Sequence, residues 1–206
     1  MESTFPLLFA AIVGFSHAFE ADHLVAVGSL VTKRDKLIPA IKDGIYWGLG
    51  HSSMVLIIGM IMIVAKATFL NDYFQHFEAA VGLMLVLLGL ARFTQYYRHR
   101  NQAEQLVSTT GGHHLAYGVG LVHGLAGSGM MILLVMTEIG DSVRSITYLI
   151  IFGIGSIVGM LAAAGIFSLP FLKRFIDNQA LRAGLIVISS LLCIGYGAYV
   201  MIVNLT

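Results

Sequence analysis

The chain has 206 residues, of which 57% are hydrophobic and only 11% are charged. About a quarter of the residues in a typical soluble domain are charged, so this chain has too few polar side chains to cover a surface that faces water. The net charge of +1 argues against a nucleic-acid partner. Cys193 is the single cysteine, which excludes an internal disulfide framework and a CxxC redox pair. The composition therefore predicts an all-α polytopic membrane protein with one domain over residues 1–206.

Six apolar segments follow one another along the chain. A lipid-exposed backbone must satisfy its own hydrogen bonds, so each segment is expected to form a helix. A membrane span needs roughly 20 apolar residues, which leaves little chain for anything else. The expected spans cover residues 5–31, 45–64, 77–96, 115–139, 146–169 and 181–203.

The basic residues collect in three of the expected loops. Ten of the 12 lysines and arginines belong to these loops or to the helix ends beside them. The positive-inside rule places such loops in the cytoplasm, so both termini are expected outside. This pattern predicts a multi-pass protein of the plasma (inner) membrane. The ten residues are Lys33, Arg34, Lys36, Lys42, Arg92, Arg98, Arg100, Lys173, Arg174 and Arg182, whereas Lys66 and Arg144 lie on the other side.

The two halves of the chain resemble each other. The segment Gly14–Ala18 around His17 has an echo in Gly120–Gly124 around His123, and Gly48–Gly50 has an echo in Gly153–Gly155. Three spans per half is an odd number, so the second half would be inverted in the membrane, as in many transporters. The expected repeats are residues 1–100 and residues 113–206, with the long polar stretch 97–114 as the linker.

The first expected span holds four ionisable residues, His17, Glu20, Asp22 and His23. A charge at bilayer depth costs at least about 2.5–3.5 kcal/mol, and a divalent cation would compensate two carboxylates. In a regular helix the two histidines would lie about 9 Å apart along the axis, too far to share one ion easily. Three explanations stay open: a broken helix, several sites along a path, or a ligand shell completed by other helices.

Further histidines lie in the other expected spans. His51 follows Gly48-Leu49-Gly50, whose small residues favour close helix packing. His123 precedes another glycine-rich stretch. Either histidine could also serve only as a hydrogen-bonding residue between helices. His113 and His114 are expected to be solvated at the cytoplasmic mouth of the fourth span.

The stretch His17-Ala18-Phe19-Glu20-Ala21-Asp22-His23 resembles the His-x4-Asp-His signature of the nickel/cobalt transporter family. Gly50-His51-Ser52 matches the Gly-His-Ser element of the same family. The region around His123 is similar to its short, urease-accessory-type branch. The chain departs from the family pattern at Glu20, where an aspartate is usual.

The resemblance implies a secondary transporter, not an enzyme, that takes up Ni²⁺ or Co²⁺ for metalloenzymes such as urease. No P-loop is present, which argues against direct ATP use. A membrane metalloenzyme, a metal exporter and a metal sensor of the same fold are the alternatives. The expected partners are the divalent ion, the bilayer, a second copy of the chain and a cytoplasmic metallochaperone, and no prosthetic group is expected. The expected metal-binding residues are His17, Glu20, Asp22, His23, His51 and His123.

Overall fold

The computed structural model describes residues 4–32, 34–65, 73–99, 112–126, 141–172 and 179–206. These residues are almost entirely helical, as the sequence predicts. The elements are α1 (Thr4–His17), α2 (Ala21–Val31), α3 (Leu37–Ala65), α4 (Phe74–His99), α5 (Gly112–Ala126), α7 (Ser142–Ser168), the short 3₁₀ helix η3 (Leu169–Phe171) and α8 (Gln179–Leu205).

Four helices, α3, α4, α7 and α8, are long and apolar enough to cross a membrane. Each corresponds to one expected span, although α3 begins eight residues earlier than its expected start at residue 45. Large apolar side chains on the outer faces of these helices are exposed, as lipid-facing residues would be. The chain is therefore an integral membrane protein.

The first expected span is not one helix. The stretch that was expected to be continuous over residues 5–31 is divided into the shorter apolar helices α1 and α2. The fourth expected span, 115–139, is described only as far as the end of α5 at Ala126. Its remainder lies outside the described residues.

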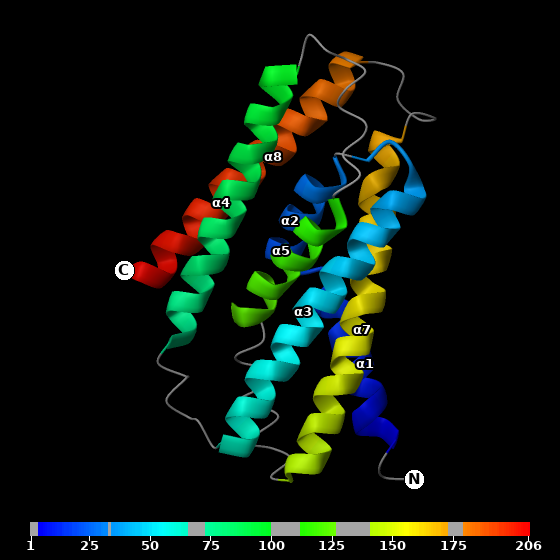
Figure 1. The fold of residues 1–206 in the computed structure, drawn as a ribbon, viewed down its shortest axis with the longest axis vertical. Coiled ribbons are helices and arrows are strands. Elements are labelled where there is room, and N and C mark those ends of the chain that lie inside the picture. The colour runs from blue at the N-terminus through cyan, green and yellow to red at the C-terminus, as the bar shows by residue number, and fades with distance from the viewer. Residues whose placement is uncertain (1–3, 33, 66–72, 100–111, 127–140, 173–178) are drawn as a thin grey trace.

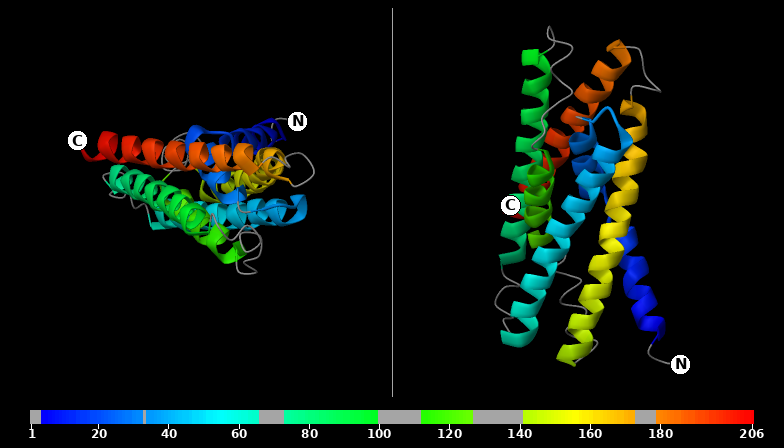
Figure 2. Two further views of the ribbon diagram at one scale, coloured as in Figure 1. Left: turned by 90° about the horizontal axis from the view of Figure 1, so that it is seen from above. Right: turned by 45° about the vertical axis from the view of Figure 1, so that its right-hand side comes forward.

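The long helices form two pairs. In Figures 1 and 2, α3 runs beside α7 in the opposite direction, and α4 is paired in the same way with α8. The short helices α2 and α5 lie between these pairs, while α1 packs against α7 and α5 packs against α3. The halves of the chain are thus interleaved, with α2 of the first half and α5 of the second half near the centre of the molecule.

The basic ends of the helices gather at one end of the molecule. The starts of α3 and α8 and the ends of α4 and α7 lie together at the top of Figure 1, and the N terminus lies at the opposite end. Arg34 precedes α3, Arg98 belongs to the last turn of α4, and Arg182 to the first turn of α8. Arg144, in the first turn of α7, lies at the other end. This grouping agrees with the predicted loop arrangement. The side of the membrane that these basic ends face stays a prediction.

Candidate metal centre

The break between α1 and α2 creates the centre. After His17 the backbone tightens, with the Phe19 amide donating to the Ser16 carbonyl at 2.9 Å and the Glu20 amide to the His17 carbonyl at 3.1 Å. Glu20 then adopts an extended conformation with φ −66° and ψ 156°. Its carbonyl accepts the first hydrogen bond of α2. The turn brings His23 back beside His17, with ring centroids 4.5 Å apart.

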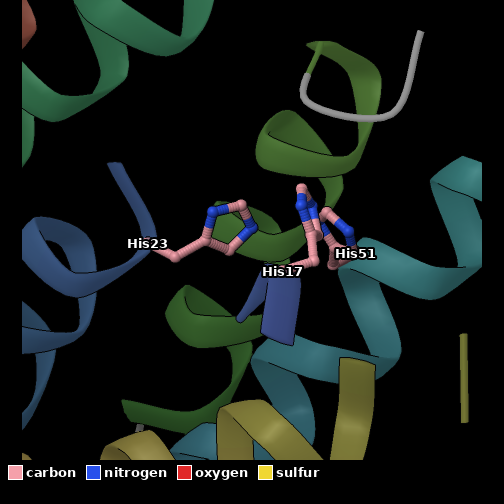
Figure 3. A group of neighbouring side chains, drawn as sticks. All are labelled: His17, His23 and His51. Carbon is pink, nitrogen blue, oxygen red and sulfur yellow. The ribbon is translucent and has the colours of Figure 1, made fainter. Parts of the chain in front are cut away.

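Three imidazoles meet at this break. His51, from the middle of α3, has its ring centroid 5.2 Å from that of His17 and 5.2 Å from that of His23. His17 is 4% exposed and the other two are fully buried. One ring nitrogen from each histidine lies within 4.8 Å of the others. Figure 3 shows the three side chains converging from α1, α2 and α3.

Two carboxylates fix the orientation of two of these rings. Nδ1 of His17 lies 2.8 Å from Oε1 of Glu20, and Nδ1 of His23 lies 2.9 Å from Oδ1 of Asp22. An ionised carboxylate only accepts hydrogen bonds, so each Nδ1 carries the proton and donates it. Each Nε2 therefore keeps its lone pair. Carboxylate–histidine pairs of this kind are the usual support of metal-bound imidazoles.

The nitrogens left over are buried and have no hydrogen-bond partner among the described residues. They are Nε2 of His17, Nε2 of His23 and both ring nitrogens of His51. A buried polar group without a partner costs about 1–3 kcal/mol. Several such groups in one place therefore need an explanation, and a shared ligand provides one.

A second triad adjoins the first. Asp22 uses Oδ1 for His23 and directs Oδ2 to Nε2 of His123, 3.2 Å away. The rings of His23 and His123 have centroids 4.4 Å apart, and His123 is fully buried. Ligand atoms of these three residues also lie within 4.8 Å of one another. The structure thus brings together all six residues singled out from the sequence: five form two triads that share His23, and Glu20 joins them through its contact with Nδ1 of His17.

Comparison with known proteins identifies a family for the chain. Residues 5–112, just over half of the chain, match the NicO family, whose description is "High-affinity nickel-transport protein". The chain belongs to this nickel-transport family.

Two curated relatives support the assignment. The chain is 29% identical over 170 residues to the Urease accessory protein UreH of Bacillus sp. (strain TB-90), which covers 78% of this chain and 75% of the relative. It is 32% identical over 95 residues to the Nickel transporter NixA of Staphylococcus aureus (strain NCTC 8325 / PS 47), which covers 40% of this chain and 27% of the relative. No solved structure matches. The expected family and its urease-accessory branch are confirmed, and the family is one of transporters, not enzymes.

Two aromatic residues that the sequence reasoning passed over also enclose the centre. The fully buried ring of Trp47 lies 5.6 Å from that of His23 and 5.9 Å from that of His123. Phe152 of α7 lies 5.5 Å from the ring of His17. Trp47 is the single tryptophan of this NicO-family chain and stands one helical turn before His51, a spacing that could have revealed it.

The expectation for His113 is wrong. This residue is half-buried, and its Nδ1 lies 2.8 Å from Oδ1 of Asp43. Asp43 also accepts two hydrogen bonds from Arg34, and the His113 ring stacks on Tyr46 with centroids 5.1 Å apart. The cluster ties α5 to α3 and to the loop before it. His114 is exposed, as the sequence predicts.

Proposed function

We propose that the chain carries Ni²⁺, and also Co²⁺, into the cell through the two triads that share His23. His17, His23 and His51 supply the imidazole ligands, and Glu20 and Asp22 orient two of them and balance the charge of the ion. His123 contributes from the second half of the chain. The observation that carries the proposal is the convergence of buried, unpartnered imidazole nitrogens at the break between α1 and α2.

The charge balance of the centre favours a divalent cation. Neutral histidines contribute no charge, and two ionised carboxylates contribute −2. A divalent ion makes the sum zero, which lowers the cost of holding charge at bilayer depth. Imidazole nitrogen is a good ligand for Ni²⁺ and Co²⁺, and carboxylate oxygen completes such sites.

We further propose that the halves form an inverted repeat. The close contacts between helices support this, because they occur in matched pairs. Gly14 of α1 packs against the carbonyl of Phe152, and Gly120 of α5 packs against the carbonyl of Trp47. Gly14 and Gly120 are 106 positions apart, and Trp47 and Phe152 are 105 apart.

Two more pairs of contacts are related by the same separations of 105 or 106 positions along the chain. A Cβ added at Gly48 would meet Ile157 at 2.8 Å, and one added at Gly153 would meet Ser52 at 3.2 Å. A reciprocal exchange of this kind is what a two-fold axis in the membrane plane predicts, with a site at the interface of the repeats. The remaining pair joins Gly50 to the carbonyl of Tyr117 and Gly155 to the carbonyl of Ala11.

The proposed mechanism is alternating access. Discontinuous helices at the membrane midplane form the binding sites of many transporters. Rocking of one half against the other would expose the centre first to the outer side, where both termini are proposed to lie, and then to the cytoplasm across the plasma (inner) membrane. The likeness to a urease accessory protein favours delivery of nickel to a metalloenzyme of that class.

Metal flux tests the proposal directly. In cells or vesicles that contain the protein, radioactive nickel and cobalt should accumulate above the empty control, and manganese should not. His17→Ala, His23→Ala and His51→Ala should each abolish uptake at unchanged membrane abundance. His76→Ala is the matched control, because His76 is exposed in the first turn of α4. Uptake at the parent rate by all three variants would show that the ligand assignment is wrong.

A further inference from the structure

A cavity of about 280 Å³ lies beside the metal centre. It is bounded by the start of α2, the end of α5, the first turns of α4 and the last turns of α8. Its polar lining comes from three acidic residues, Glu20, Asp22 and Glu78, together with Asn204 and two tyrosines. Among the residues that the structure describes, no basic side chain belongs to the lining.

The cavity borders the two carboxylates that contact the buried imidazoles. Glu20 and Asp22 line it, and the same two carboxylates hold Nδ1 of His17 and Nδ1 of His23. Asp22 has 21% of its side chain exposed, whereas the histidine side chains it contacts are fully buried. His123 directs Nε2 at this cavity-lining carboxylate and leaves Nδ1 buried without a partner in the described part of the chain. The two carboxylates thus form the boundary between the open cavity and the closed centre.

Glu78 has no part in the centre itself. It lies in the first turns of α4 and is half-buried, and among the described residues no hydrogen bond or ion pair satisfies its carboxylate. Asn204, in the last turn of α8, donates from Nδ2 to the Val200 carbonyl at 2.9 Å, which leaves its own carbonyl oxygen free to face a cation. Both residues lie at the helix ends remote from the basic loops.

We propose that this cavity is the entrance through which a hydrated divalent cation reaches the metal centre, and that Glu78 attracts the cation there. The inference rests on the proposed transport function. Oxygen ligands suit a cation that still carries its water, and imidazoles suit the ion once it has lost water. Asp22 and His23 belong to the triad beside the cavity, and His23 also belongs to the inner triad. His23 therefore connects the triad that the entering ion meets first with the triad that it reaches next.

The physical role of Glu78 is electrostatic. A cleft lined by one sign of charge and bounded by apolar walls raises the local concentration of the opposite ion. Val81, Val200 and Val203 supply such walls here. Removing the charge should therefore weaken loading of the ion without destroying its site.

Transport kinetics give the first test. Glu78→Gln should raise the half-saturating nickel concentration by about 3- to 10-fold at an unchanged maximal rate, and Glu78→Asp should restore most of the difference. Asp141→Asn is the matched control, because Asp141 is an exposed acid at the same end of the molecule and outside the cavity lining. It should transport with parent kinetics.

Chemical labelling gives the second test and does not depend on transport. A cysteine introduced as Val200→Cys should react faster with a cationic than with an anionic methanethiosulfonate reagent, and Glu78→Gln should lower the ratio of the two rates. The parent chain is the labelling control, since Cys193 is fully buried. An unchanged half-saturating concentration or an unchanged labelling ratio would overturn the inference. Parent-like uptake by the histidine variants would instead overturn the proposed function.

Discussion

Asp22 connects the parts of the centre, which makes it the most informative single substitution. Its carboxylate accepts from the His23 amide at 2.8 Å, from Nδ1 of His23 at 2.9 Å and from Nε2 of His123 at 3.2 Å. Asp22→Asn keeps the size of the side chain. Its amide oxygen can still accept both bonds from His23, but its NH₂ group can only donate toward His123, which would move the imidazole proton from Nε2 to Nδ1 and remove the free Nδ1 lone pair.

The expected loss of nickel affinity follows from the difference between the aspartate and the asparagine side chain. The variant reverses the hydrogen bond to His123 and removes one negative charge, so the centre with a divalent ion would change from neutral to +1. Residues that support metal ligands typically contribute 10- to 100-fold in affinity. We therefore expect the half-saturating nickel concentration of Asp22→Asn to rise by about 10- to 100-fold, which corresponds to about 1.4–2.8 kcal/mol.

The assay is nickel uptake across a range of concentrations, together with titration calorimetry on the purified protein. Ser16→Ala is the control, because Ser16 is exposed next to His17 and its hydroxyl donates within α1, to the Val13 carbonyl at 3.0 Å. Both variants should reach the membrane at the abundance of the parent. Parent-like nickel affinity in Asp22→Asn would refute the role of this carboxylate in charge balance and ligand orientation.

Three further predictions concern packing, stability and topology. Gly120→Ala should destabilise the protein by about 1–3 kcal/mol, because the added methyl group would overlap a backbone carbonyl of α3. Gly118→Ala on the same helix would place its methyl group in open space, so equal melting temperatures for the two variants would contradict the close packing. Asp43→Asn should lower stability by about 2 kcal/mol, because it leaves the mostly buried Arg34 without its charged partner. An unchanged thermal unfolding midpoint in detergent would show that this ion pair contributes little. A cysteine introduced as Lys36→Cys should resist an impermeant reagent added outside intact cells, and rapid labelling from outside would reverse the proposed topology.

Much of this molecule follows from the sequence alone. The scarcity of charged residues excludes a water-facing surface and requires membrane helices. The presence of His17, Glu20, Asp22 and His23 in one apolar segment indicates a cation site, because their burial would otherwise be too costly. The grouping of basic loops at one end could likewise be predicted, since it depends only on the order of the segments.

Tertiary structure decided how those residues meet. No proline or glycine occupies the break at Ala18, Phe19 and Glu20, so local helix propensity gives no reason for the chain to turn there. The turn lets His17 and His23 share a space with His51, and the glycines that allow α1, α3, α5 and α7 to approach closely hold these helices in position. The partner of His113 could not be predicted from the sequence for a similar reason, because Asp43 is 70 positions away in the chain. The sequence determines which groups must find partners in the membrane, whereas packing between distant helices determines which partners they find.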